Sequence, residues 1–420
     1  MLSRADKIFI ALIGAGLLSI YVGVVSMYVW LGLMLVRLFM LNRVELGIFS
    51  LMFGSSLFGR LFASDLLVVV LTTVFIILGY VLLRKEILHT IVRNRVSWLV
   101  FGAMIFYFVM MYLLGPMNSY ATGKIARLVV RGITLLLMFQ IYVQSKNVNN
   151  NHFAILFGLL AIFYLSQAYI VYGIRPSGLF DVSFFRDIAE EIGRDASGTS
   201  MVNTHTQGYL ALGTLVFLIS KKNLDIKAPW IIIFVAILAL LILISGARQT
   251  MVATLGVLGL RIMLGDGNVI KNSIFALLCI SAVAIGALNS GSSVVEKSKS
   301  GTNAGEVIHR DLDTPFRVMR VNPVFGVGFG GYVEYANKEY PHNMFFEIFS
   351  EYGLIGCIIF CIFFVISLCV CSIGFKYTTN SGVYFFLFLV VYSFRAMISG
   401  DLSSSIIIFS IILSFTDYSK

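Results

Sequence analysis

The amino-acid sequence predicts an all-α polytopic membrane protein. Of its 420 residues, 59% are hydrophobic and only 12% are charged, whereas soluble domains carry about 25% charged residues. Apolar runs of about 20 residues, the length that a helix needs to cross a bilayer, recur along the chain. The runs lack strict alternation of apolar and polar residues, and the chain holds only 6 prolines. Both features favour membrane helices over a transmembrane barrel.

The apolar runs give the expected order of the spans. The first run, residues 8–40, fits either one long tilted span or two short ones. Residues 46–62 are weakly apolar and dotted with glycine, as in an interfacial or re-entrant segment. Further spans are expected at about 64–83, 97–115, 125–144, 152–172, 204–220, 229–246, 247–264, 271–289, 342–373, 381–396 and 402–418.

Basic links between the spans indicate the orientation, because cytoplasmic loops are enriched in Lys and Arg. Links 84–95 and 221–227 are strongly positive, and Lys271 and Lys376 lie in two further links. If the first run is a single span, all four links fall on one side. This arrangement gives about 12 spans with both termini cytoplasmic.

This count divides the chain into three parts. Residues 1–289 carry spans 1–9, with an outer loop at 173–203. Residues 290–341 form a large outer loop between spans 9 and 10, and residues 342–420 carry spans 10–12.

Positive residues on the outer face are unexpected, because the orientation rule makes them sparse there. They indicate either an anionic ligand or salt bridges to neighbouring acidic residues. The outer segments and the start of span 125–144 hold, among others, Arg175, Arg310, Arg317, Arg320, Lys124 and Arg127.

Arg248 lies in a tight turn, Ser245–Gln249, between two apolar runs. An arginine at a membrane boundary is costly unless it faces a wet cavity, has a partner or snorkels to the interface. Because a guanidinium suits bidentate phosphate contacts, we predict that Arg248 holds a phosphate.

A short helix is expected within the large outer loop. Asp313 or Thr314 can cap it, with Pro315 at its first position. Such a helix presents Arg317 and Arg320 on one face, three residues apart.

A glycine-rich run, Gly326–Gly331, follows this helix. Glycine lets the backbone pass close to another chain segment or to a ligand. The run does not match a dinucleotide-binding fingerprint, because no strand precedes it and no helix of a βαβ unit follows.

His342 and Asn343 begin the next span. Histidine is common where a hydroxyl proton must move near neutral pH, although it also serves to hydrogen-bond a loop. Asn343 suits either a helix cap or a ligand contact. Glu347 and Glu351 follow four residues apart; Glu351 is not on the face of His342, and Glu347 lies closer in angle to Asn343. His205, in another polar span start, either lines the same cavity or belongs to a cap.

No metal site is predicted. Asp311 and Asp313 form a DxD pair, but a three-residue match is common by chance and Asp313 has a competing capping role. Metal-ligand spacings of Cys and His are absent from the sequence.

Three segments together resemble the O-antigen polymerase/ligase superfamily of bacterial envelope proteins. They are SGARQ at 245–249, NPVFGVGFGGY at 322–332 and HNMFFEIFSEYGLIG at 342–356. They stand in the family's order, with the large loop between the first segment and the last. The resemblance covers about the C-terminal half of the chain, and the N-terminal half matches only in hydropathy.

The resemblance implies an integral glycosyltransferase of the bacterial inner membrane, active on the periplasmic face, without metal or other cofactor. Its donor would be an oligosaccharide on undecaprenyl diphosphate. A polymerase transfers the glycan to the next lipid-linked repeat unit, and a ligase transfers it to lipid A-core. No residue separates the two, and polymerase is preferred because only a sparse motif set matches. A chain-length regulator and a flippase are the expected protein partners, with no nucleic acid.

The resemblance also implies roles for the residues. Arg248, His342 and a loop arginine would act in catalysis, with Arg310 nearest to the family's spacing and Arg317 or Arg320 as alternatives. The expected substrate contacts are Arg320, Asn343, Arg175, Lys124, Arg127 and His205.

Two other classes compete with the enzyme. A transporter of lipid-linked sugars would show charged or helix-breaking residues within its spans and an internal repeat, whereas the polar residues here gather at one membrane face. A structural partner in an envelope complex would not depend on His342 or Arg248.

Overall fold

The computed structural model divides the chain into two compact units. Unit 1 comprises Met1–Leu82 and Lys146–Ala304, and unit 2 comprises Leu83–Ser145 and Gly305–Lys420. The residues that the structure describes are 3–56, 65–145, 148, 152, 155–163, 165, 204–220, 229–244, 250, 252–257, 313–336, 340–341, 343–375, 389, 391–393, 395–397 and 401–414.

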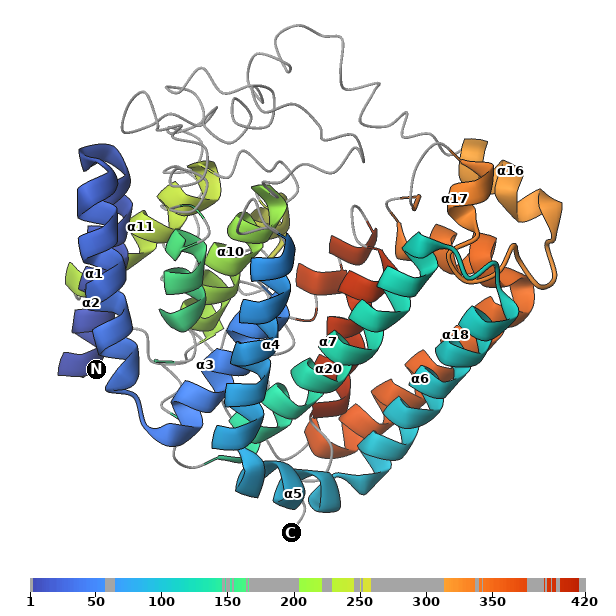
Figure 1. Ribbon diagram of the computed structural model, residues 1–420, viewed down its shortest axis with the longest axis horizontal. Helices are drawn as coiled ribbons and strands as arrows, with labels where there is room; N and C mark the ends of the chain where they lie inside the picture. Colours follow the sequence, from blue (N-terminus) through green and yellow to red (C-terminus); the bar gives the residue numbers. More distant parts are fainter. Residues whose placement is uncertain are drawn as a thin grey trace, which may run out of the picture. The chain divides into compact units, whose positions relative to one another are not determined.

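Within these ranges every regular element is an α-helix, in agreement with the predicted class (Figure 1). Unit 1 contains α1 (Arg4–Val22), α2 (Val24–Phe39), α3 (Arg43–Ser56), α4 (Asp65–Leu82), α10 (Thr204–Ser220) and α11 (Pro229–Ile244). Unit 2 contains α5 (Arg84–Arg93), α6 (Arg95–Leu114), α7 (Ser119–Gln144), α16 (Asp313–Val321), α17 (Tyr332–Tyr335), α18 (Met344–Phe375) and α20 (Leu402–Ser414).

Four stretches of the described helices are long and apolar enough to cross a membrane. They are Arg4–Val22, Arg95–Leu114, Ser119–Gln144 and Met344–Cys369. Shorter apolar stretches lie in α2, α4, α11 and α20. The count of about 12 spans, the three-part division of the chain and the periplasmic position of the large loop remain predictions.

The first apolar run forms two helices. The chain leaves α1 at Gly23, whose φ of 143° and ψ of 175° end the helical path. The indole N–H of Trp30 in α2 donates a hydrogen bond of 2.7 Å to the carbonyl oxygen of Leu12 in α1. The two helices therefore fold back on each other. The count of about 12 spans took this run as one span.

The glycine-dotted segment 46–62 lies largely in α3, which packs against α4. A Cβ on Gly54 would crowd the side chain of Ile76, and one on Gly79 would crowd Leu51. The two glycines thus permit close approach of the two helices.

The predicted spans agree well with the described helices of both units. The range 204–220 matches α10, and α4, α6, α11, α18 and α20 begin within about two residues of their predicted starts. α7 begins six residues earlier than predicted, because the Asn118 side chain caps it by accepting a hydrogen bond of 2.7 Å from the Ala121 N–H. Most of the predicted spans 247–264, 271–289 and 381–396 lies outside the described residues, as does the outer loop 173–203.

Unit 2 is a bundle in which α6 runs beside α18, and α7 runs beside α20 (Figure 1). Hydrogen bonds join α6, α7 and α20. The indole of Trp98 in α6 donates to the side chain of Gln140 in α7 at 2.9 Å. The Gln140 amide in turn donates to the Leu413 carbonyl oxygen at 3.2 Å. α5 precedes α6 at one end of this bundle, and the glycine-rich segment lies at the other end (Figure 1).

Gly16→Ala should destabilise the α1–α2 pair by about 1–3 kcal/mol, because its Cβ would overlap Ile162 and the Trp30 indole. The Trp30 indole cannot easily turn away, because its N–H is bonded to Leu12. Gly32→Ala in α2 is the matched control, since nothing lies within 4 Å of its Cβ. Unfolding midpoints of the purified chain in detergent measure the difference, and equal midpoints would contradict this packing.

Candidate functional site

The glycine-rich segment pairs with the backbone of α18. The N–H groups of Val327 and Gly328 donate to the carbonyl oxygens of Ser350 and Glu351, at 3.0 and 2.8 Å. In the other direction the Leu354 N–H donates to the Pro323 carbonyl oxygen at 2.9 Å. Main-chain hydrogen bonds in both directions therefore join the segment to α18, as they join two neighbouring strands of a sheet.

This pairing is possible because α18 is broken at Gly353. Its φ of 63° and ψ of −162° are not helical. The break frees carbonyl and N–H groups that a continuous helix would use internally. A side chain at Gly353 would be strained at this φ and would also overlap the Val324 backbone.

The glycines let the segment pass closely over the backbones of α18 and α7. We call this close passage the glycine crossing. Gly326, Gly328 and Gly330 have φ values of 74°, 91° and 70°. A Cβ on Gly326 would overlap the backbone of Glu351, and one on Gly330 would overlap Ala121. Of the two expectations for this run, close passage of another chain segment is therefore confirmed.

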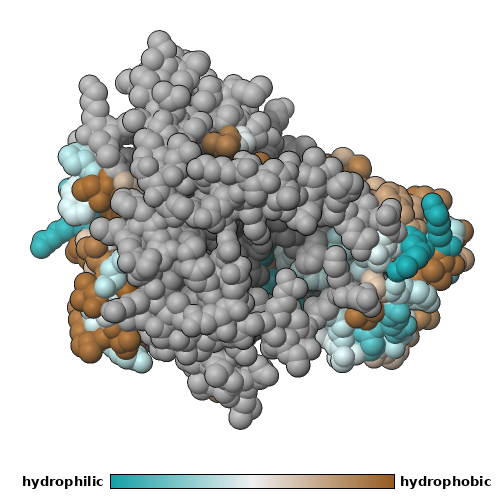
Figure 2. Space-filling view, turned by 90° about the horizontal axis from the view of Figure 1, so that it is seen from above, coloured by the Kyte–Doolittle hydropathy of each residue, from teal (hydrophilic) through white to brown (hydrophobic). Residues whose placement is uncertain are grey.

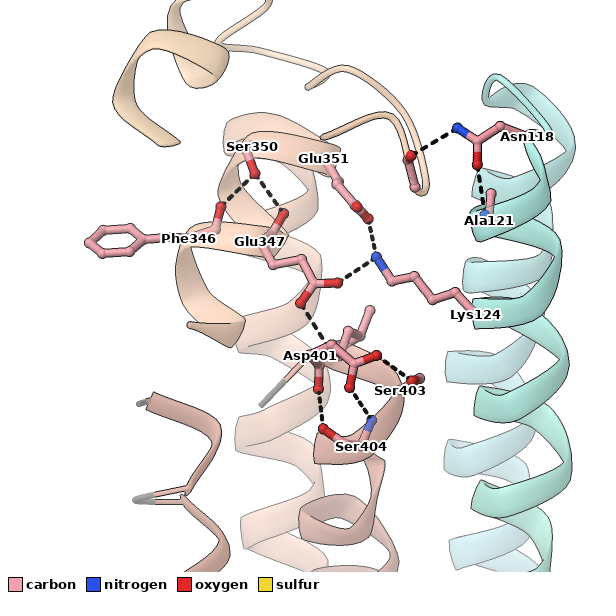
Figure 3. A network of polar contacts seen from close by, with 12 residues as sticks. Asn118, Ala121, Lys124, Phe346, Glu347, Ser350, Glu351, Asp401, Ser403 and Ser404 are labelled. Carbon is pink, nitrogen blue, oxygen red and sulfur yellow. Dashed lines mark hydrogen bonds and ion pairs between the residues drawn. The ribbon is translucent and has the colours of Figure 1, made fainter. Parts of the chain in front are cut away.

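Beneath the crossing lies a cluster of three charged residues, the charged triad Lys124, Glu347 and Glu351 (Figure 3). Lys124 Nζ lies 2.5 Å from Oε1 of Glu347 and 2.5 Å from Oε2 of Glu351. All three side chains are 0% exposed. The two glutamates reach the same lysine because residues four apart lie on one helix face.

Aromatic rings and the N-terminus of α20 enclose the charged triad. Lys124 Nζ lies 4.8 Å from the ring centroid of Phe329 and 5.7 Å from that of Tyr120, within the range of cation–π attraction. The Leu402 N–H donates to Oε2 of Glu347 at 2.8 Å. Glu347 therefore joins α18 to both α7 and α20.

Asp401 caps α20 beside the charged triad. It accepts hydrogen bonds from the Ser403 hydroxyl at 2.5 Å and from the Ser404 N–H at 2.8 Å. Burial alone would raise the pKa of Asp401, but the hydrogen bonds from Ser403 and Ser404 outweigh this effect and hold it below its usual range.

The short arginine helix predicted in the loop is α16. Val318 on its inner face is buried with Tyr332 and Ala336, while Arg317 and Arg320 are exposed. At this end of unit 2, at the right of Figure 2, hydrophilic and hydrophobic residues lie side by side on the described surface. The Arg317 guanidinium donates to the Tyr335 carbonyl oxygen at 3.4 Å.

Asn343 caps α18. Its side-chain oxygen accepts from the N–H groups of Phe345 and Phe346 at 2.9 and 3.2 Å. Its side-chain amide donates to the Met397 carbonyl oxygen at 2.8 Å. Both halves of this side chain are therefore engaged in structure, and a substrate contact by Asn343 remains a prediction.

Of the other predicted site residues, three are described by the structure and four are not. Lys124 is buried in the charged triad, so in this arrangement its charge faces two glutamates, while Arg127 is exposed on α7. His205 lies in α10 of unit 1. Outside the described residues lie Arg175, Arg248, Arg310 and His342.

Glu347 and Glu351 are the site residues that the sequence interpretation left without a role. Their signal was present, because carboxylates within an apolar span are rare and usually have a partner. Among the described residues no group of three His, Cys, Asp or Glu side chains is placed to hold a metal ion. Asp313 lies in α16, and Asp311 of the DxD pair lies outside the described ranges.

No family model matches this chain, and no curated protein matches it.

Gly326→Ala should destabilise unit 2 by about 2–4 kcal/mol, because it combines a strained positive φ with overlap of the Glu351 backbone. Gly102→Ala in α6 is the control, since its Cβ would meet nothing within 4 Å. Thermal unfolding of both purified variants measures the effect. A Gly326→Ala protein as stable as the Gly102→Ala protein would contradict the crossing.

Proposed function

We propose that this chain is a membrane glycosyltransferase that acts at the outer face of the bacterial inner membrane. Its donor is an oligosaccharide carried on undecaprenyl diphosphate. The acceptor is the next lipid-linked repeat unit, so that the enzyme is a repeat-unit polymerase. The reaction requires no metal ion.

The observation that carries the proposal is the position of the arginine helix against the start of α18. Phe316 of α16 packs edge-to-face on Phe346, with ring centroids 5.5 Å apart. Asn343, the residue after His342, caps the same helix start. The arginines of α16 and Asn343 at the start of α18 therefore belong to one end of unit 2.

The chemistry of the transfer suits these residue types. A departing diphosphate gains negative charge in the transition state, and fixed cations aimed at it stabilise that charge. The exposed guanidinium groups of Arg317 and Arg320 are available for this contact, and Arg248 is the proposed cation from the other segment of the motif set.

The acceptor hydroxyl must lose a proton as it attacks the anomeric carbon. His342 is the proposed group that takes this proton or orients the hydroxyl, since an imidazole titrates near neutral pH. The lipid tail of the donor would remain in the bilayer beside the apolar helices, which accounts for a site at the end of a membrane bundle.

Alanine variants of His342, Arg248 and Arg317 test the proposal in a bacterial strain from which the gene for this chain has been deleted. Each should abolish long glycan chains on a gel while the amount of protein is unchanged. His89→Ala and Arg84→Ala on the exposed face of α5 are the matched controls and should restore normal ladders.

The glycan products of these strains also distinguish a polymerase from a ligase. Lipid A-core capped with one repeat unit indicates lost polymerisation, as proposed. Bare core with accumulated lipid-linked glycan indicates a ligase instead. Normal ladders in both His342→Ala and Arg248→Ala would contradict the site.

A further inference from the structure

An exposed apolar patch lies where the chain leaves α16 and enters the glycine crossing. Val321, Val324 and Phe325 are 53%, 45% and 62% exposed. Single exposed apolar side chains are common on proteins, but several large ones together usually mark contact with a partner or a membrane. We call these three residues the apolar turn, and ask which surroundings suit it.

Hydrogen bonds fix the backbone of the apolar turn. The Gly326 N–H donates to the Asn322 carbonyl oxygen at 2.8 Å. The Phe325 N–H donates to the side-chain oxygen of the same asparagine at 3.2 Å. The folded chain therefore holds the backbone that carries these exposed side chains in one conformation.

The apolar turn borders the outer face of α18. The Leu354 N–H donates to the Pro323 carbonyl oxygen at 2.9 Å, and the Ile355 N–H donates to the Val324 carbonyl oxygen at 3.2 Å. Leu354 and Ile355 are themselves exposed. The apolar side chains of the turn and those of the helix are therefore neighbours on one surface.

This face of α18 continues as an apolar stripe. Ile358, Ile362 and Val365 are each more than half exposed, and their spacing of four and three residues places them on one side of the helix. The stretch Met344–Cys369 of α18 is long and apolar enough to cross a membrane. Lipid is the surrounding that suits such a stripe, because hydrocarbon, unlike water, does not disfavour exposed apolar side chains.

The length of α18 puts the membrane boundary beside the apolar turn. After its break at Gly353 the helix continues to Phe375, a length of about 33 Å at 1.5 Å per residue. The hydrocarbon core of a bilayer is about 30 Å thick. If this part of α18 spans the core, its first residues, Leu354 and Ile355, lie at the boundary, and the apolar turn lies beside them.

The charge next to the apolar turn also suits a membrane interface. Arg317 and Arg320 are exposed on the last turns of α16. Segments that lie at an interface combine apolar side chains, which enter the acyl boundary, with basic side chains, which meet the phosphates of anionic lipids. A bilayer therefore matches both parts of this surface.

We propose that the apolar turn is inserted in the bilayer, at the boundary between the acyl chains and the headgroups. Part of the predicted outer loop 290–341 then belongs to the surface that contacts lipid. Arg317 and Arg320 lie at the level of the lipid phosphates. This inference rests on α18 crossing the membrane and does not depend on the proposed glycosyl transfer.

Photo-crosslinking of the full chain tests the contact. The probe p-benzoylphenylalanine replaces Phe325, Ile358 in the stripe, or the exposed Glu334 on α17 as the control. The protein is placed in vesicles of phosphatidylethanolamine and phosphatidylglycerol and irradiated. Mass spectrometry should find a phospholipid adduct with the probe at Phe325 and at Ile358, and none at Glu334. An adduct at Ile358 alone, or a link from Phe325 to a second copy of the chain, would overturn the proposal.

Spin labelling in the same vesicles gives a second readout. Phe325→Cys and Glu334→Cys are made in a full chain whose 5 native cysteines are replaced by alanine. A nitroxide at Phe325→Cys should collide more often with oxygen, which concentrates in lipid, than with a water-soluble nickel chelate. The label at Glu334→Cys should show the reverse. Equal collision ratios at the two positions would contradict insertion of the apolar turn.

Discussion

The ammonium group of Lys124 lies 2.5 Å from a carboxylate oxygen of each of two glutamates, with no solvent around it. In such surroundings, removing one member of a buried ion pair costs about 3–5 kcal/mol. The three residues come from α7 and α18, and Glu347 also accepts the first N–H of α20. The charged triad is thus the contact by which three helices of unit 2 are held in one arrangement.

The glycine crossing depends on this arrangement and also covers it. The break at Gly353 turns the α18 backbone outward just after Glu351, so that the groups that bind the glycine segment and the side chain that binds Lys124 lie within a few residues. Asn118, which caps α7, donates to the Gly330 carbonyl oxygen at 3.1 Å (Figure 3). The exposed arginines of α16 therefore precede a segment that is fixed to the helix bundle.

Hydropathy alone predicted most of the described helices, because a span long enough to cross a bilayer is marked by its composition. It could not locate the turn at Gly23, since the first apolar run continues on both sides of it. Hydropathy also missed the start of α7, because its first turns are polar and its first residue is fixed by the Asn118 cap. Pairing Lys124 with Glu351 across 227 residues of sequence requires the tertiary fold. The resemblance to a glycosyltransferase family rests on the segments 245–249, 322–332 and 342–356, and its two residues Arg248 and His342 lie outside the described residues.

A double-mutant cycle between Lys124 and Glu351 tests the central claim most directly. The unfolding free energies of the parent chain, Lys124→Met, Glu351→Gln and the double variant are compared in detergent. If the two side chains form one buried cluster, the double variant should be more stable than the sum of the single effects predicts, by about 1–3 kcal/mol. Effects that add to within about 0.5 kcal/mol would mean that the two residues do not interact, and would contradict the account.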